Sequence, residues 1–270
     1  MIIDGKKMAE EIKESLKGEI VKSGKKLKLG IVQVGENSVS QKFIERKVKF
    51  SEEIGVKTKI YNLPAEITTN KLRKKMAEIC KLVDGVIIQL PLPQHINTQY
   101  ILGSIPQKKD VDVLSAKSIG DFVVGKQNVL PPVVRAIRKI FVKNNIEIVG
   151  KNVVIIGAGL LVGKPAMIWF INQGATVFVL RRLTQNIFKF TKEADIIITG
   201  VGNPGLIKPE MVKEGVIIID AGTAMEKEKL SGDVDLSVAS RASIFTPVPG
   251  GIGPLTVAMV FKNLLALNKK

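Results

Sequence analysis

Short apolar strands and amphipathic helices alternate along the whole chain, and this alternation restricts its fold more than any other feature. In the first half, strands are expected at 27–34, 56–63 and 83–90, and helices at 4–22, 41–54 and 68–82. In the second half, strands are expected at 152–156, 176–180, 196–199 and 216–220, and helices at 165–173 and 253–267. Such alternation is typical of a mainly parallel sheet with helices on both faces, so the sequence predicts an α/β fold.

A chain of 270 residues is long enough for two modest domains. We expect two domains around a cleft. The first takes residues 1–130 and 253–270. The second, at 148–252, is a Rossmann-type doubly wound domain with a mainly parallel sheet, and residues 131–147 form a connecting helix.

The formal net charge of +16 favours acidic partners such as phosphates or polyanionic substrates. Basic residues are spread along the chain and aromatic residues make up only 5% of it. Nucleic-acid-binding surfaces usually combine a basic stripe with stacking aromatic rings, so we expect no nucleic-acid partner.

No apolar run reaches the roughly eighteen residues that a membrane span needs, and the N-terminus lacks a signal pattern, so a cytoplasmic protein without a membrane partner is expected. Cys80 is the only cysteine and His95 the only histidine. Because no cysteine or acidic cluster has ligand spacing either, we expect no metal site.

A glycine-rich turn follows the strand at 152–156. Gly157, Ala158 and Gly159 precede Gly163, which begins a helix, in a G-x-G-x-x-x-G pattern one residue longer than the common fingerprint. Glycines allow a tight turn and close approach of the backbone to a pyrophosphate, and the helix N-terminus adds a partial positive charge. This segment predicts a dinucleotide-binding turn.

Two arginines, Arg181 and Arg182, follow the next strand, where an acidic residue would accept from the ribose 2′-hydroxyl of NAD. Guanidinium groups suit a 2′-phosphate, so NADP is favoured over NAD, although a solvated basic loop explains the arginines equally well. Small residues also follow later strands at 199–205 and 220–223. We expect Thr223 to line the nicotinamide side, but ordinary turn chemistry is nearly as good an interpretation.

The segment at 246–256 reads T-P-V-P-G-G-I-G-P-L-T. Its prolines fix φ and remove backbone donors, and its glycines let a ligand approach closely. Pro249, Gly250 and Gly251 are therefore expected to bind a ligand; a rigid turn before a helix is the alternative.

Three polar groups stand out in the first half. Lys47 lies one helical turn after Phe43, Gln89 lies near the carboxyl end of an apolar strand, and Asp112 lies in a loop. Considered one at a time, each has an ordinary structural interpretation: Lys47 as a solvated helix lysine, Gln89 as an amide at a strand end and Asp112 as a turn residue.

Taken together, these segments resemble the bifunctional methylenetetrahydrofolate dehydrogenase/cyclohydrolase family, over nearly the whole chain in order and spacing. The specific pieces are Q-L-P-L-P at 89–93, K-D-V-D at 109–112, V-G-K-P at 162–165 and T-P-V-P-G-G-I-G-P at 246–254.

The resemblance implies two reactions of one-carbon metabolism. Hydride passes from 5,10-methylenetetrahydrofolate to NADP⁺, and water opens the resulting methenyl cation to 10-formyltetrahydrofolate. It also implies that Lys47 transfers protons, that Gln89 positions Lys47, that Asp112 anchors the pterin and that Phe43 stacks on the folate. A lysine in a partly dry cleft should have a lowered pKa, which suits this role. A homodimer is implied as well, and the folate partners include forms with an acidic polyglutamate tail.

The chain departs from the family at several positions. Phe43 replaces a tyrosine, Val113 a glycine and Val133 a threonine, and Ala158 and Gly159 replace an arginine and a serine. A β-branched residue cannot take φ > 0 cheaply, so we expect the loop at Val113 to be rearranged. The cofactor carries the hydride chemistry, so these polar losses predict that hydrolysis is weakened more than dehydrogenation.

Two alternatives stay open from the sequence. One is an NAD-dependent dehydrogenase without cyclohydrolase activity. The other is a catalytically silent homologue that binds folate or nucleotide.

Overall fold

The computed structural model describes residues 1–126, 128–226 and 229–269. The chain forms two compact units. The three-stranded unit comprises Glu10–Pro132 and Val257–Lys270, and the five-stranded unit comprises Met1–Ala9 and Val133–Thr256. The predicted domain boundaries stay a prediction, because compact units need not be domains that fold independently.

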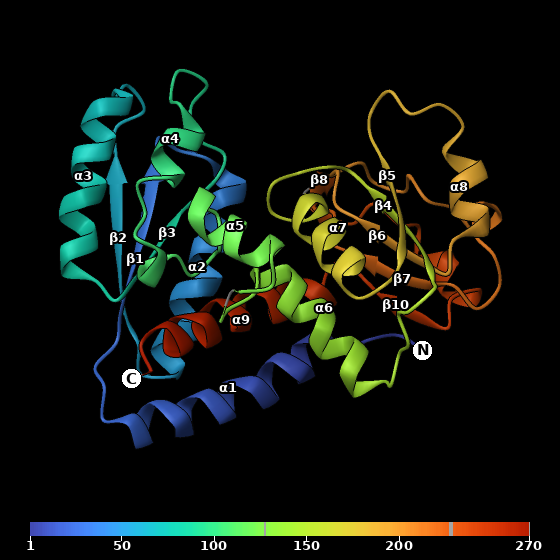
Figure 1. The fold of residues 1–270 in the computed structure, drawn as a ribbon, viewed down its shortest axis with the longest axis horizontal. Coiled ribbons are helices and arrows are strands. Elements are labelled where there is room, and N and C mark those ends of the chain that lie inside the picture. Colours follow the sequence, from blue (N-terminus) through green and yellow to red (C-terminus); the bar gives the residue numbers. More distant parts are fainter. Residues whose placement is uncertain (127, 227–228, 270) are drawn as a thin grey trace. The chain divides into compact units, whose positions relative to one another are not determined.

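The three-stranded unit has a parallel sheet of strand order β2-β1-β3. The strands are β1 (Lys28–Val34), β2 (Lys57–Leu63) and β3 (Gly85–Ile88). Helix α2 (Ser38–Glu53) leads from β1 to β2, and α3 (Thr69–Leu82) leads back across the sheet to β3. Because parallel crossovers are right-handed, the two helices cover opposite faces of the sheet (Figure 1).

The other helices of this unit are α4 (Thr98–Leu102), the 3₁₀ helix η1 (Gln107–Lys109), α5 (Ala116–Val123), most of α1 (Gly5–Ser23) and most of α9 (Ile252–Leu267). The core is apolar, and β1 is buried along all but its first residue. Phe50 of α2 stacks on Phe261 of α9, with ring centroids 5.2 Å apart. This contact joins the C-terminal helix to the helix that carries Lys47.

The five-stranded unit has a parallel sheet of order β10-β7-β6-β4-β5. Its strands are β4 (Asn152–Ile156), β5 (Thr176–Leu180), β6 (Ile196–Thr199), β7 (Ile217–Asp220) and β10 (Ile244–Thr246). Helices α7 (Gly163–Asn172) and α8 (Ile187–Glu193) lie on opposite faces (Figure 1). From β4 the chain continues to β5 on one side and then returns to β6 on the other side of β4. This change of direction makes the carboxyl end of β4 the topological switch point of a doubly wound sheet.

This unit also includes α6 (Pro132–Lys143) except its first residue, the antiparallel pair β8 (Ala224–Glu226) and β9 (Lys229–Ser231), and the 3₁₀ helices η2 (Pro209–Met211) and η3 (Leu236–Ser240). Phe141 of α6 makes edge-to-face contacts with Trp169 and Phe170 of α7. The predicted α/β class with a Rossmann-type parallel sheet is confirmed.

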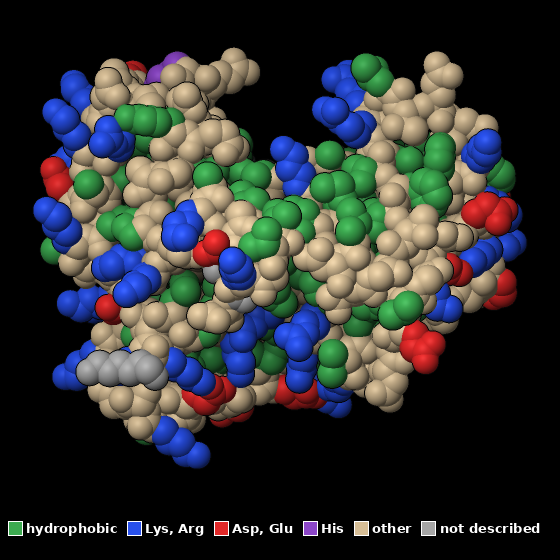
Figure 2. Space-filling model, in the orientation of Figure 1, with side chains coloured by type: hydrophobic (Ala, Val, Ile, Leu, Met, Phe, Trp, Pro, Cys, Tyr) green, Lys and Arg blue, Asp and Glu red, His purple; other side chains and the backbone are tan. Residues whose placement is uncertain are grey.

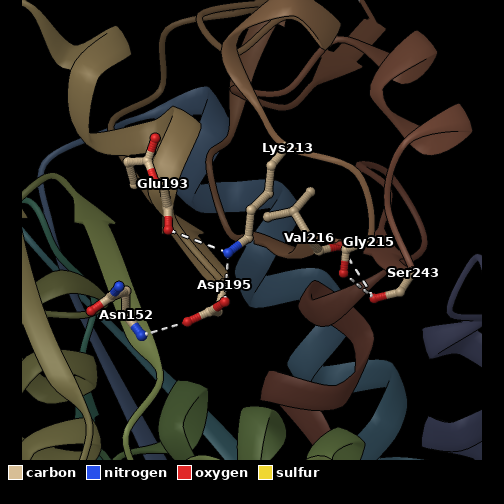
Figure 3. A network of polar contacts seen from close by, with 7 residues as sticks. All are labelled: Asn152, Glu193, Asp195, Lys213, Gly215, Val216 and Ser243. Atoms are coloured by element: carbon tan, nitrogen blue, oxygen red, sulfur yellow. Dashed lines mark hydrogen bonds and ion pairs between the residues drawn. The ribbon is translucent and has the colours of Figure 1, made fainter.

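A polar network ties together the amino ends of the strands in the five-stranded unit (Figure 3). Asp195 accepts from the Asn152 N–H at 2.8 Å and from Lys213 Nζ at 2.6 Å, and Lys213 also donates to the Glu193 carbonyl at 3.4 Å. Burial opposes ionisation of Asp195, but these hydrogen bonds lower its pKa overall. Ligands of doubly wound sheets bind at the carboxyl ends of the strands. The network lies at the opposite edge of the sheet and so away from the expected ligand site.

Basic side chains are scattered over the face shown in Figure 2 rather than gathered in one stripe. Charge alone therefore does not locate a site. Within the described part of the chain, none of the helices has the length and apolar character required to cross a membrane.

Candidate active site

Lys47 and Gln89 come together from two neighbouring elements of the three-stranded unit. Lys47 lies in the third turn of α2, and Gln89 directly follows β3, where its N–H still bonds the Val32 carbonyl at 2.9 Å. Lys47 Nζ donates to Gln89 Oε1 at 3.0 Å, and Gln89 Nε2 donates to the Leu90 carbonyl at 3.1 Å. The second bond orients the amide so that its oxygen faces the lysine.

Asp112 is the charged partner of this pair. Burial raises the pKa of its carboxyl to about 6, against the opposing charge of Lys47, while Asp110 adds to the rise. Burial likewise lowers the pKa of Lys47, and the Asp112 charge opposes that shift. Both groups are thus moved towards their neutral forms, and a neutral amine can accept a proton.

Val113 itself takes a left-handed backbone conformation, with φ +58°, although such a φ is costly for a β-branched residue. Whether this loop is rearranged relative to the family stays a prediction. The left-handed backbone costs a β-branched residue about 1–2 kcal/mol, but burying a valine side chain gains about as much. Val113 is 1% exposed, and the Asp110 carboxylate closes the turn by accepting from the N–H groups of Leu114 and Ser115. Tertiary packing therefore outweighs the local preference.

Asn263 of α9 supports the same loop and was missed from the sequence. It is fully buried, and its Nδ2 donates to the carbonyls of Val111 at 2.8 Å and Leu130 at 2.7 Å. The available signal was an asparagine, next to Lys262, in an otherwise mainly apolar last helix.

Phe43 lies on α2 one turn before Lys47, so the two side chains share one side of the helix. The ring is half-buried, and the Arg46 guanidinium lies 5.8 Å from its centroid. The ring therefore lies one helical turn from Lys47, on the same side of α2.

The glycine turn after β4 is required by close packing. Gly157 has φ +98°, and a Cβ on Gly163 would lie 1.8 Å from the Gly157 carbonyl oxygen. These two glycines let the start of α7 approach the strand. Gly159, in contrast, is exposed with open space around its Cβ position, and Ala158 is half-buried beside it. The departures at 158 and 159 therefore leave the turn intact.

Arg181 and Arg182 follow β5 at the same edge of the sheet. Ile156 pairs with Leu180, and the Gly157 N–H bonds the Leu180 carbonyl at 2.9 Å, so Arg181 directly adjoins the glycine turn. Both arginines are exposed, with their side chains available to an anion.

The loops after β6 and β7 also meet at this edge. The Thr223 carbonyl oxygen lies 3.2 Å from the position that a Cβ on Gly202 would occupy. Two buried carboxylates, Asp220 and Asp233, accept hydrogen bonds from backbone N–H groups of these loops. Neither residue was identified from the sequence. Their partners are mainly backbone groups distant in sequence, which no motif reveals.

The proline-glycine segment forms a tight turn after β10. The Gly251 N–H bonds the Pro247 carbonyl at 2.8 Å, and Gly250 has φ +101°. Thr246 anchors the turn, because its Oγ1 accepts from the Asp220 N–H at 2.8 Å. Pro249 is left exposed at the tip.

The predicted site residues divide between the units. The three-stranded unit holds Phe43, Lys47, Gln89 and Asp112. The five-stranded unit holds Gly157, Ala158, Gly159, Gly163, Arg181, Arg182, Thr223, Pro249, Gly250 and Gly251. Among the described residues, His, Cys, Asp and Glu form no group of three or more that could hold a metal ion.

Two family models match the chain. The tetrahydrofolate dehydrogenase/cyclohydrolase catalytic domain matches residues 3–112, and the NAD(P)-binding domain of the same family matches residues 131–270. The predicted family is thereby confirmed.

Individual relatives agree over their full lengths. The bifunctional protein FolD of Listeria innocua is 38% identical over 276 residues, which covers 100% of this chain and 97% of the relative. The crystal structure of the bifunctional enzyme FolD from Campylobacter jejuni has a TM-score of 0.93 at 37% identity, covering 99% of this chain and 98% of that one. The Trypanosoma brucei enzyme, crystallised with NADP and an inhibitor, has a TM-score of 0.93 at 31% identity, covering 99% and 96%. The chain therefore belongs to the tetrahydrofolate dehydrogenase/cyclohydrolase family.

Proposed function

We propose that this chain oxidises 5,10-methylenetetrahydrofolate with NADP⁺ and hydrolyses the methenyl product to 10-formyltetrahydrofolate. The observation that carries the proposal is the bond from Lys47 Nζ to Gln89 Oε1, in a chain whose two halves match both domains of this family. The family match also confirms the predicted enzyme class, a dehydrogenase and cyclohydrolase.

In the hydrolytic step, the Lys47 amine accepts a proton from the attacking water. Its lowered pKa raises the fraction of neutral amine near neutral pH. Gln89 holds the amine in place, and Asp112 accepts from N–H groups of the pterin. The Phe43 ring stacks on the substrate beside them.

The five-stranded unit fits a dinucleotide at the turn after β4. A Cβ on Gly157 or Gly163 would fill the space that this turn needs, and the start of α7 adds a partial positive charge. When bound, the nicotinamide supplies the acceptor for hydride. Thr223 lines the same edge, and Pro249, Gly250 and Gly251 form the turn that meets the folate.

The choice of NADP over NAD rests on Arg181 and Arg182, which are exposed beside the glycine turn. Replacing both with alanine should raise the KM for NADP⁺ about tenfold or more and leave the KM for NAD⁺ unchanged, because NAD⁺ lacks the 2′-phosphate. Equal changes for both dinucleotides would overturn this choice. Turnover of NAD⁺ by the unaltered chain, without hydrolysis, would favour the NAD-dependent alternative.

We also propose that Phe43 weakens hydrolysis relative to dehydrogenation, because it lacks the hydroxyl of the family's tyrosine. Phe43→Tyr should raise the rate of methenyl hydrolysis and leave hydride transfer nearly unchanged. An unchanged ratio of the two rates would contradict this part of the proposal.

The whole proposal is tested by supplying methylenetetrahydrofolate and NADP⁺ to the purified chain. Reduced cofactor and then 10-formyltetrahydrofolate should accumulate. Cofactor binding without reduction would identify the chain as a silent homologue. We further propose a homodimer, as the resemblance implies, and sedimentation at several concentrations would distinguish it from a monomer.

A further inference from the structure

We propose that Asp233 is a positioning residue for the dinucleotide, acting through the loop that follows β6. This inference rests on the proposed function insofar as a dinucleotide binds at the carboxyl edge of the five-stranded sheet. Asp233 itself is buried, with 0% exposure, and so acts through its hydrogen bonds and not by contact with the ligand.

One carboxylate takes three donors, one from the last residue of β6 and two from the loop that follows it. Asp233 Oδ2 accepts from Thr199 Oγ1 at 2.5 Å and from the Val201 N–H at 2.8 Å. Asp233 Oδ1 accepts from the Asn203 N–H at 2.7 Å. A single side chain therefore holds the segment 199–203 by three hydrogen bonds, and these bonds fix the conformation of the segment.

The site requires a carboxylate in particular. A buried charge is costly unless hydrogen bonds compensate it, and the three donors do so here. An asparagine would turn an NH₂ group towards at least one N–H or O–H donor. The backbone is also shaped around this side chain, because a Cβ on Gly222 would lie 2.1 Å from Asp233 Cγ.

Asp233 is held in turn by Asp220, the last residue of β7. Asp220 Oδ1 accepts from the N–H groups of Gly222 at 2.9 Å and Asp233 at 3.2 Å, and Oδ2 accepts from the Val234 N–H at 3.0 Å. A Cβ on Gly232 would lie 2.1 Å from Asp220 Oδ2. The loops after β6 and β7 are thus locked to the segment that carries Asp233.

The loop that Asp233 holds adjoins the glycine turn after β4. The position of a Cβ on Gly157 lies 2.6 Å from Val201 Cγ1 and 3.2 Å from the Gly200 carbonyl oxygen, and that of Gly200 lies 2.8 Å from Val162 Cγ1. Val201 is 45% exposed, so it presents an apolar surface at the edge where ligands bind. A shift of this loop would displace both that surface and the turn beneath the pyrophosphate.

The experiment compares Asp233→Asn with Asp235→Asn, an identical substitution two residues away. Asp235 is exposed, and its carboxylate accepts from the Ser237 N–H at 2.8 Å at the start of η3. Fluorescence titration with NADPH should give a Kd at least about tenfold higher for Asp233→Asn and unchanged for Asp235→Asn. In steady-state assays the KM for NADP⁺ should rise, while the KM for methylenetetrahydrofolate should stay constant. An unchanged Kd, or equal changes in both KM values, would overturn the proposal.

A second variant guards against misfolding of Asp233→Asn. Thr199→Val keeps the side-chain shape and removes one donor to Asp233, so it should raise the Kd for NADPH in the same direction by a smaller factor. An unchanged Kd in a folded Thr199→Val protein would also refute the inference. If the unaltered chain binds NADPH but reduces no NADP⁺, the proposed function fails and the inference stands on the titrations alone. If it binds no dinucleotide, both fail.

Discussion

Lys47 Nζ lies 3.0 Å from Gln89 Oε1, and this hydrogen bond joins the interior of α2 to the end of β3. The acceptor is a neutral amide, so it positions the amine without a full opposing charge. Burial lowers the pKa of Lys47, and Asp112 is the charge that opposes it. The neutral fraction of the amine therefore depends on burial and on the charge of Asp112, while Gln89 fixes the position of the amine.

Gln89→Glu should move the pH dependence of hydrolysis to higher pH. A carboxylate beside Lys47 stabilises the ammonium form and raises its pKa, so less neutral amine is present at a given pH. The rising limb of kcat/KM for methenyl hydrolysis should shift up by about one pH unit or more. Gln89→Leu, which removes the bond without adding charge, should lower the rate without this alkaline shift. A rising limb at the same pH in the Glu variant would count against Lys47 as the titrating group.

The left-handed backbone at Val113 predicts that a glycine variant is more stable than an alanine variant, the reverse of the usual order. Both Val113→Ala and Val113→Gly lose the buried methyl groups, but only glycine relieves the strain at φ +58°. The glycine variant should therefore be more stable than the alanine variant by about 1 kcal/mol in urea unfolding. At Val111, which is buried without a positive φ, the alanine variant should be the more stable one. The same order at both positions would contradict the account of this loop.

Asn263 should contribute more to stability than Asn268, although both donate to two carbonyls. Asn263→Ala leaves the buried Val111 carbonyl and the partly buried Leu130 carbonyl without this donor and should lower the free energy of unfolding by about 1–3 kcal/mol. Asn268 is half-buried, so water can replace its bonds, and Asn268→Ala should cost less than about 1 kcal/mol. Equal losses in chemical denaturation would show that the Asp112 loop does not depend on Asn263.

Asp220 should make stability fall as pH rises. Burial raises its pKa to about 7, against three backbone N–H bonds, and Asp233 adds to the rise. Between the ordinary value of 3.8 and about 7, the folded chain holds a proton that the unfolded chain has released. The free energy of unfolding should therefore decrease across this window, by at most about 1.4 kcal/mol per pH unit. Asp220→Asn should flatten the curve measured in urea at a series of pH values, and parallel curves for both proteins would exclude this role.

The sheet of the five-stranded unit could be predicted closely from the sequence. The bounds of β4, β5 and β6 agree with the expected segments, because each is a short, mainly apolar run rich in β-branched residues that ends at a glycine or a charged residue. Strand β3 is shorter than expected, at Gly85–Ile88, since only these residues pair with β1.

Short elements could not be predicted in the same way. Helix α8 has seven residues and β10 has three, too few for a helical or strand period to stand out. Strand β10 exists because it pairs with β7, and that partner lies more than twenty residues earlier in the chain. Tertiary pairing, not local pattern, forms such elements.

Motifs indicated Lys47 and Gln89 as candidate site residues, but not the geometry of their contact. Lys47 and Gln89 are 42 positions apart, so their contact follows from the tertiary fold and not from the local sequence. The positive φ of Val113 was not expected, because the steric preference of valine is a local property, whereas the burial that offsets its cost depends on the tertiary fold. Asp233 and Asn263 were missed because their hydrogen-bond partners are distant in sequence. A buried polar side chain can be recognised only once those partners are known.

The role of Lys47 is tested most directly by the rate of methenyltetrahydrofolate hydrolysis in Lys47→Met, compared with Lys49→Met on the exposed side of the same helix. Lys47→Met should lose at least about 100-fold in this rate and still bind NADPH, because a proton acceptor has been removed from a folded protein. Lys49→Met should stay within about twofold of the unaltered chain. Hydrolysis by Lys47→Met at the unaltered rate would contradict the assignment of the amine as the proton acceptor.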